Sequence, residues 1–215
     1  MDYTSPEYDA IALLTIDVQR DFLDGQPAEI PGTSAILPAL TAVVDAFRNS
    51  RLPIVHVVRI YLPDGSNVDL CRRAAVRDGA RLVCPGTDGV QLAEAIAPAP
   101  RLRLDPDFLL TGRLQQIGDR EWVMYKPRWG AFFGTHLESH LHRLGITSLA
   151  IAGCNFPNCP RTSIYEASER DFRVVLVGDA VSGLYERGRE ELAGIGVTVL
   201  ASSELIVAVN ASAAV

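Results

Sequence analysis

The chain has 215 residues, 48% of them hydrophobic and 21% charged, and carries a formal net charge of −6 at pH 7. This length suits one α/β domain with a core of its own, so we expect a single domain over residues 1–215. The negative charge argues against a nucleic-acid-binding protein, and no apolar stretch is long enough to span a membrane, so we expect a small-molecule partner.

Short apolar runs alternate with helical patterns along the chain. Apolar strands separated by helices are typical of a parallel sheet covered on both faces. The pattern predicts an α/β fold with three α/β/α layers, Rossmann-like, around a six-stranded and mainly parallel sheet. Strands are predicted at residues 11–16, 53–58, 121–125, 148–153, 173–180 and 197–202. Helices are predicted at residues 33–50, 89–97, 135–145, 160–172 and 186–195.

Three stretches carry other information about the chain. Residues 98–120 break the alternation, and we expect an irregular excursion or a short hairpin there. No G-x-G-x-x-G motif or P-loop is present, so the usual nucleotide signatures are missing. The first ten residues, MDYTSPEYDA, are polar and acidic and lack the apolar segment of a secretory signal, so we expect a cytoplasmic location.

The four cysteines are Cys71, Cys84, Cys154 and Cys159. Without an export signal they are better interpreted as reduced thiols than as a disulfide framework, and their spacings lack the close pairs of a structural zinc site. A redox pair of Cys154 and Cys159 stays open as an alternative, and it predicts a reversible disulfide.

Three reactive side chains follow predicted strands. Asp17 ends AIALLTID, Lys126 ends EWVMYK, and Cys159 comes after SLAIAG and a tight loop. Pro160 suits the first turn of a helix, so Cys159 stands at a helix N-terminus, where free N–H groups and the helix dipole favour the thiolate. Each residue alone is more often a capping residue, a solvated charge or a buried thiol. Together they predict a site at the carboxyl edge of the sheet, where α/β proteins bind ligands.

Three ordered blocks carry a resemblance to a known family. They are IDVQRDF at residues 16–22, KPRWGAFFGTHLESHLHRLGI at 126–146 and AGCNFPNCPRTSIYEASERDFRVVLVGDA at 152–180. Over most of its length the chain resembles the isochorismatase-like cysteine hydrolase superfamily, in its amidohydrolase branch. That superfamily has a strand-end Asp in a D-x-Q-x-D-F setting, a Lys before an aromatic segment, and a turn that ends in a nucleophilic Cys.

The resemblance implies a role for each reactive residue. Cys159 is the nucleophile, Asp17 takes its proton and returns it to the leaving amine, and Lys126 holds the thiolate and orients the carboxylate. A cis peptide bond between Cys154 and Asn155 is also implied, so that the N–H groups of Asn155 and Cys159 form an oxyanion hole. The implied activity is hydrolysis of a C–N bond in a small amide or ureido (N-carbamoyl-type) substrate through a thioester, with release of ammonia or an amine.

The sequence departs from the family pattern in two places. Phe156, Pro157 and Pro160 replace the usual residues around the nucleophile, so we expect a reshaped pocket. The nicotinamidase branch holds a divalent metal through an Asp-x-His pair, but the corresponding segment here reads HVVRIYLPDGS, so we expect no metal and no other cofactor. His136 and His140 in HLESH are interpreted as a solvated helix face, because the Glu lies one place off the H-E-x-x-H motif.

Substrate contacts are predicted for Phe22, Trp129, Arg161 and Tyr165. Phe22 and Trp129 are aromatics that lie close in sequence to the expected Asp and Lys of the site. If Arg161 turns inward it can clamp a carboxylate, which favours an N-carbamoyl amino acid; otherwise it is an exposed first-turn arginine without such a contact. Weaker candidates are Phe132, Phe133, Arg59 and Arg128.

Two other functions stay open. Vinyl-ether hydrolysis of the isochorismatase type runs through an acid without a thiol nucleophile, so Cys159 counts against it. A catalytically silent, small-molecule-binding scaffold on the same fold is the second alternative. The resemblance also implies a homodimer or homotetramer, and the apolar tail at residues 204–215 either packs at such an interface or frays.

Overall fold

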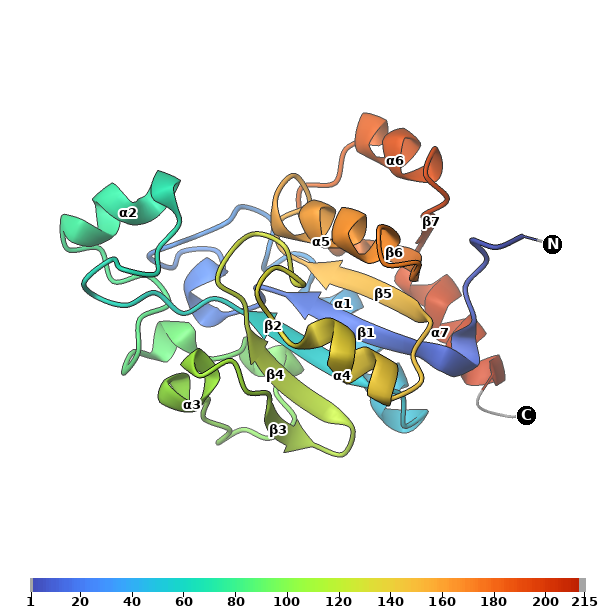
Figure 1. The fold of residues 1–215 in the computed structure, drawn as a ribbon, viewed down its shortest axis with the longest axis horizontal. Coiled ribbons are helices and arrows are strands. Elements are labelled where there is room, and N and C mark those ends of the chain that lie inside the picture. The colour runs from blue at the N-terminus through green and yellow to red at the C-terminus, as the bar shows by residue number, and fades with distance from the viewer. Residues whose placement is uncertain (1, 213–215) are drawn as a thin grey trace.

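The computed structural model describes residues 2–212 and contains a seven-stranded sheet with the strand order β3-β4-β2-β1-β5-β6-β7 (Figure 1). Every neighbouring pair is parallel except β3 and β4. The strands are β1 (Ile11–Ile16), β2 (Ile54–Val58), β3 (Gln115–Gly118), β4 (Glu121–Tyr125), β5 (Ser148–Gly153), β6 (Arg173–Val181) and β7 (Thr198–Leu200). The α-helices are α1 (Leu37–Asn49), α2 (Leu70–Arg77), α3 (Pro106–Leu110), α4 (Leu137–Arg143), α5 (Cys159–Ser168), α6 (Glu186–Ala193) and α7 (Ser202–Ser212).

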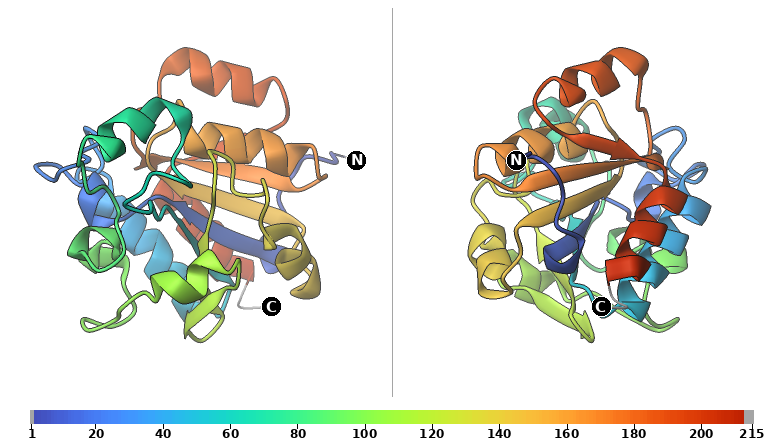
Figure 2. Two further views of the ribbon diagram at one scale, coloured as in Figure 1. Left: turned by 60° about the vertical axis from the view of Figure 1, so that its left-hand side comes forward. Right: turned by 90° about the vertical axis from the view of Figure 1, so that its right-hand side faces the viewer.

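Helices cover both faces of the sheet (Figure 2). On one face, α1 and α7 pack through apolar side chains that include Leu40 and Leu205. On the other, α4, α5 and α6 contribute Leu141, Ile164 and Leu192 to a second apolar cluster. These three layers confirm the predicted α/β/α architecture.

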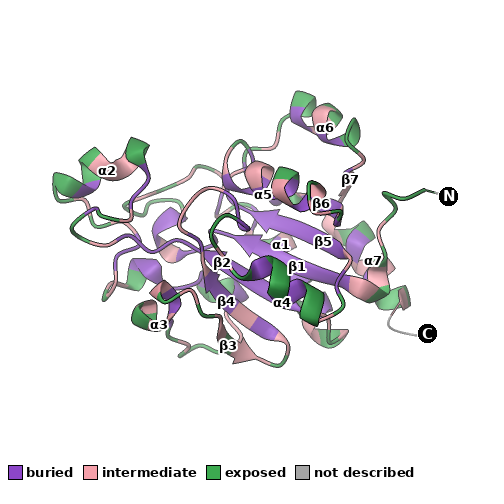
Figure 3. Ribbon diagram, in the orientation of Figure 1, coloured by how far each residue is buried: buried purple, intermediate pink, exposed green. Residues whose placement is uncertain are grey.

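The central strands are buried on both faces, which is why they read as continuous apolar runs. All six residues of β1 and all six of β5 are buried (Figure 3). β1 lies between β2 and β5, with Leu13 opposite both Ile54 and Ala150. The strand that carries Asp17 at its end therefore lies in the middle of the sheet.

The sheet has one strand more than predicted. β3 lies inside the region 98–120, where an irregular excursion or short hairpin was expected, and it forms an edge hairpin with the antiparallel strand β4 that follows this region. Its sequence QQIG is at most half-buried, so it has no apolar run that would reveal a strand.

The helices differ from the prediction in four places. The expected helix at residues 89–97 is wrong, because this segment forms two separate 3-10 turns, Asp88–Val90 and Glu94–Ile96. Helices α2 and α3 were not predicted, and α3 lies inside the region 98–120. Much of the C-terminal tail forms α7, whose Leu205 and Val209 pack into the chain's own core, while residues 213–215 lie outside the described part. No helix within residues 2–212 combines the length and apolar character that crossing a membrane requires.

Candidate active site

Four adjacent parallel strands are each followed directly by a chemically active residue. Asp17 follows β1, Arg59 follows β2, Lys126 follows β4 and Cys154 follows β5. The chain leaves β1 toward β2 on one side and returns as β5 on the other. The crevice between Asp17 and Cys154 is therefore a topological switch point, where open α/β sheets bind ligands.

Asp17 and Gly153 shape the backbone at this switch point. Asp17 has φ 54°, a left-handed conformation that Asp tolerates better than most residues, and its N–H donates to the carbonyl of Val57 at 2.8 Å. Gly153 has φ 115°, and a Cβ there would lie 2.2 Å from the carbonyl oxygen of Ile16. Only glycine allows this approach, which brings the loop at residues 154–158 against the end of β1.

Lys126 and Asp17 form a buried ion pair. Nζ of Lys126 lies 2.8 Å from Oδ2 of Asp17, and it also donates to the carbonyl of Arg128 at 3.3 Å. Lys126 is fully buried and Asp17 is 3% exposed. Oδ1 of Asp17 is buried too and has no hydrogen-bond partner within residues 2–212. One carboxylate oxygen is thus held by the cation, and the other is free to accept a proton.

Cys159 is the first residue of α5 and lines the same cavity as Asp17. Burial raises the pKa of its thiol and the Asp17 carboxylate raises it further, whereas Lys126 and Arg59 lower it. The predicted resting thiolate is therefore corrected, because desolvation outweighs the favourable charges at the helix N-terminus. With its pKa raised, this thiol would need a nearby base to act as a nucleophile, and the Asp17 carboxylate lines the same cavity.

The peptide bond between Cys154 and Asn155 is cis, as the resemblance implied. The Cys154 thiol is fully buried and donates to the carbonyl of Asp17 at 3.1 Å. Burial raises the pKa of this thiol well above its ordinary value, which disfavours the reactive thiolate. The backbone N–H groups of Asn155 and Cys159 have no acceptor within residues 2–212, and both residues line the cavity.

Arg59 is a second buried cation beside the thiol. Its Nη2 lies 3.8 Å from Sγ of Cys159, and its Nη1 lies 2.9 Å from Oδ2 of Asp69. Gln19 holds the backbone of Arg59 in place: its Nε2 donates to the Arg59 carbonyl, and its Oε1 accepts the Arg59 N–H. Burial by itself would lower the pKa of Arg59, but the negative groups around it, led by Asp17, raise it, so the guanidinium stays charged.

The cavity in front of the thiol is narrow. Its volume is about 10 Å³, which is room for one water molecule. A substrate therefore reaches the thiol only when lining side chains move. The lining contains two of the predicted substrate contacts, Phe22 and Trp129. It is completed by Asp17, Ile30, Arg59, Asp69, Arg72, Cys154, Asn155, Asn158 and Cys159.

Arg161 and Tyr165 do not line the cavity. The guanidinium of Arg161 pairs with Glu191 on α6 and donates to the hydroxyls of Tyr185 and Tyr165. Tyr165 is 37% exposed. Of the two alternatives for Arg161, the outward one is observed, because α6 supplies a carboxylate to this first-turn cation.

Arg72, in the first turn of α2, is a different cation that does line the cavity. Its guanidinium lies 5.9 Å from the centre of the Phe22 ring. No carboxylate is within ion-pair distance of it in the described part of the chain. It is therefore free to meet an anionic ligand.

Sequence reasoning missed Gln19, Asp69 and Arg72 and considered Arg59 only as one of several arginines. A signal existed for Arg59, which directly follows an apolar strand as the two predicted charges do. Gln19 belongs to the D-x-Q-x-D-F block. Its two hydrogen bonds to the Arg59 backbone explain why a glutamine suits that position. Asp69 and Arg72 come from a segment without local periodicity, so only the folded chain brings them to the site.

The residues at this edge do not fit a divalent metal. After β2, where the nicotinamidase pair would begin, Arg59 places a guanidinium in the cavity and engages Asp69. Within residues 2–212, no group of three or more His, Cys, Asp or Glu side chains could hold an ion. The two histidines of HLESH lie in different surroundings. His136 is exposed, whereas His140 is buried, with its ring centre 4.6 Å from that of Trp122. The predicted solvated helix face is therefore wrong for His140.

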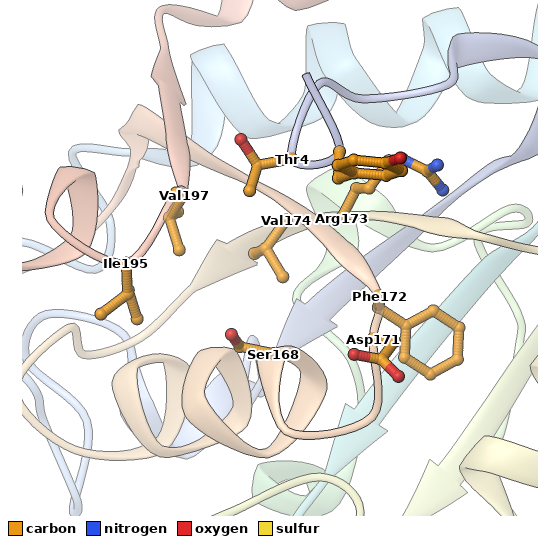
Figure 4. Close-up of a pocket in the computed structure, with 10 residues that line it drawn as sticks. Thr4, Ser168, Asp171, Phe172, Arg173, Val174, Ile195 and Val197 are labelled. Atoms are coloured by element: carbon orange, nitrogen blue, oxygen red, sulfur yellow. The ribbon is translucent and has the colours of Figure 1, made fainter. Parts of the chain in front are cut away.

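A larger cavity of about 390 Å³ lies away from this edge (Figure 4). It is lined by Thr4, by Ser168 at the end of α5, and by Arg173 and Val197 near the starts of β6 and β7. These are the amino-terminal ends of parallel strands, opposite to Asp17. Its described lining contains no cysteine or histidine, so the narrow cavity is the stronger candidate for chemistry.

Comparisons with known proteins place the chain among its relatives. It is 31% identical over 176 residues to a probable inactive nicotinamidase of Arabidopsis thaliana, covering 80% of each chain. It is 25% identical over 180 residues to an N-carbamoylsarcosine amidase of an Arthrobacter species, covering 81% of this chain and 62% of that protein. A solved isochorismatase family protein from Desulfovibrio vulgaris superposes with a TM-score of 0.78 at 29% identity, covering 91% of this chain and 96% of the other. The Isochorismatase domain profile matches residues 11–195, and the chain therefore belongs to the isochorismatase family.

Proposed function

We propose that this protein is a cysteine-dependent amidohydrolase that cleaves the C–N bond of a small amide or ureido compound. One observation carries the proposal: Cys159, Asp17 and Asn155 line one cavity, and within residues 2–212 neither Oδ1 of Asp17 nor the backbone N–H groups of Asn155 and Cys159 have a hydrogen-bond partner. This is the set of parts that acyl transfer needs, namely a nucleophile, a base and an oxyanion site. Similarity to an N-carbamoylsarcosine amidase supports C–N bond cleavage.

In the first half of the reaction, Asp17 Oδ1 takes the thiol proton as Sγ of Cys159 attacks the carbonyl carbon. The N–H groups of Asn155 and Cys159 stabilise the negative oxygen of the tetrahedral intermediate. When the intermediate collapses, the C–N bond breaks and Asp17 returns the proton to the departing nitrogen. The products of this half are a thioester on Cys159 and free ammonia or amine.

In the second half, water attacks the thioester carbon. Asp17 accepts one proton of the water, the C–S bond breaks, and the proton returns to the sulfur, which restores the thiol and releases the acid. Lys126 holds and orients the Asp17 carboxylate through its contact with Oδ2 in both halves of the reaction. Arg59, 3.8 Å from the sulfur, stabilises the thiolate as it forms.

The test is ammonia release by the purified protein on nicotinamide, biuret, N-carbamoyl amino acids and simple aliphatic amides. Cys159→Ala is expected to lower kcat by more than about 10³-fold on every compound that the wild type cleaves, because the nucleophile is gone. Cys71→Ala, which changes an exposed cysteine on α2, is the matched control and should retain activity. Acyl adduct mass on Cys159 in rapidly quenched samples would reveal the thioester.

Equal rates for wild type and Cys159→Ala on a compound would contradict thiol catalysis. The same assay separates the rivals. Turnover of isochorismate that survives Cys159→Ala indicates vinyl-ether hydrolysis. Binding without turnover of any compound indicates a catalytically silent scaffold. Similarity to a probable inactive nicotinamidase makes this alternative worth testing.

If the substrate carries a carboxylate, Arg72 and not Arg161 is the residue that binds it. Arg72→Met is expected to raise KM for an N-carbamoyl amino acid by about 10-fold or more, because one charge-assisted contact is lost, and to leave neutral amides unaffected. Arg161→Met, which removes a guanidinium already paired with Glu191, should change KM less than about twofold. Steady-state kinetics on both substrate types check this, and equal effects of the two variants would contradict it.

A further inference from the structure

Asp69 is a buried carboxylate in the candidate cavity that the proposed chemistry leaves unused. It is 4% exposed and lines the cavity with Cys159 and Arg59. It stands at the N-cap position of α2, but its side chain makes no capping hydrogen bond there. An aspartate at this position ordinarily accepts hydrogen bonds from N–H groups of its own helix. The Asp69 side chain instead contacts Tyr61 and Arg59.

The two oxygens of Asp69 have different surroundings. Oδ2 accepts the Tyr61 hydroxyl at 2.8 Å and lies 2.9 Å from Nη1 of Arg59. Burial raises the pKa of Tyr61, which keeps its hydroxyl a donor. Oδ1 is buried and has no hydrogen-bond partner within residues 2–212. Buried acceptors in folded proteins are nearly always paired, so an unpaired one in the wall of a cavity indicates a donor on the ligand.

The Arg59 guanidinium fixes where that donor must be. One of its terminal nitrogens faces the sulfur of Cys159 and the other faces Asp69, so a single planar group separates the reacting sulfur from the carboxylate. Because Asp69 and Cys159 line one small cavity, a substrate atom that meets Asp69 is expected to be a near neighbour of the carbon that the sulfur attacks. In a ureido compound, the atom that fits is the nitrogen retained on the acyl side, whose N–H lies one bond from that carbon.

We propose that Oδ1 of Asp69 accepts the N–H of the retained nitrogen, so that the site selects N-carbamoyl compounds with a secondary nitrogen. This inference rests on the proposed function and narrows its substrate class. A carbon analogue, or a substrate with an alkyl group on that nitrogen, leaves Oδ1 buried without a partner, and sites built around a hydrogen bond reject such analogues.

The geometry dictates an informative variant, Asp69→Asn. The Tyr61 hydroxyl donates to the δ2 position and the positive Arg59 guanidinium lies 2.9 Å from it, so the amide oxygen of the asparagine will occupy that position and its NH₂ group will take the place of Oδ1. An acceptor is thereby exchanged for a donor of the same shape. The N–H of the substrate then meets another N–H, and the selectivity should vanish or invert.

Binding is measured calorimetrically in the Cys159→Ala background, so that no turnover interferes. The ligands are N-carbamoylglycine, its N-methyl analogue N-carbamoylsarcosine, and succinamate, in which CH₂ replaces the N–H. With Asp69 present, N-carbamoylglycine should bind about 10- to 100-fold more tightly than either analogue. With Asp69→Asn, the affinities for N-carbamoylglycine and its analogues should differ by less than about threefold, or the analogues should bind more tightly. Tyr61→Phe, which leaves Oδ1 as the acceptor, should keep the preference.

The affinities for the three ligands are compared on one preparation of each variant, so any misfolded fraction affects all three measurements equally. Equal binding of the three ligands, binding of none, or a preference that persists in Asp69→Asn would overturn the inference, and persistence would assign the preference to steric fit. Failure of the proposed function looks different: the binding preference is present, yet wild-type protein releases no ammonia from N-carbamoylglycine.

Discussion

Lys126→Met is expected to abolish activity and to lower the free energy of unfolding by about 3–5 kcal/mol, because it leaves the Asp17 carboxylate buried without its cation. The pair is almost completely enclosed, with Nζ 2.8 Å from Oδ2. Asp17→Asn should destabilise the protein comparably, since it leaves the ammonium group unpaired. Urea unfolding monitored by circular dichroism measures both effects.

The double variant Asp17→Asn/Lys126→Met separates stability from chemistry. Removing both charges removes the uncompensated buried ion, so we expect most of the lost unfolding free energy to return. Activity should not return, because no base remains to ionise a thiol whose pKa is raised by burial. A double variant as unstable as the sum of its parts would show that the pair is not coupled. One that regains activity would remove Asp17 from the mechanism.

Glu121→Gln is expected to cost about 2–3 kcal/mol of unfolding free energy, while kcat stays unchanged because this residue is remote from the cavity lining. Glu121 accepts from His56 Nε2 at 2.8 Å and from Arg48 at 2.8 and 3.0 Å. His56 Nδ1 in turn lies 2.7 Å from the hydroxyl of Thr15. This buried network ties β1, β2 and β4 to α1, so removing its one anion weakens several elements together.

The Glu121 network also predicts a pH dependence. Burial alone would raise the pKa of Glu121, but hydrogen bonds from His56 and Arg48 lower it to about 2. A carboxyl whose pKa is depressed on folding stabilises the protein fully above its unfolded pKa, near 4.5, and loses that contribution as pH falls toward 2. Urea midpoints measured between pH 7 and pH 2 should therefore decline more steeply for wild type than for Glu121→Gln.

Asp45→Asn is the matched control for this network. It removes the exposed partner of Arg48, at 3.4 Å, and leaves the buried one. Because exposed pairs contribute little, its stability should lie within about 1 kcal/mol of wild type, with the same acid sensitivity. A wild-type acid profile that runs parallel to that of Glu121→Gln would show that another carboxyl dominates the loss.

The fold was predictable where a strand is buried on both faces. β1 and β5 are buried at all six positions and each has only one polar side chain, so local composition alone identifies them. β3 escaped notice because an edge strand is stabilised by pairing with its neighbour and not by an apolar run of its own. The prediction of a helix at residues 89–97 was wrong because tertiary packing decides the conformation of this segment. Its apolar residues pack on the core from two separate 3-10 turns.

The local sequence by itself determined that Asp17, Lys126 and Cys159 share one edge, because Asp17 and Lys126 directly follow apolar runs, Cys159 follows one after a short loop, and parallel strands end together. Only the tertiary structure decided what surrounds the thiol. Strand order brings β5 beside β1, α6 draws Arg161 outward, and α2 returns Asp69 to the cavity. Such contacts join segments far apart in the chain, and residue spacing within one segment carries no information about them. The raised pKa of Cys159 likewise depends on the tertiary structure, because every element that packs around the sulfur contributes to its desolvation.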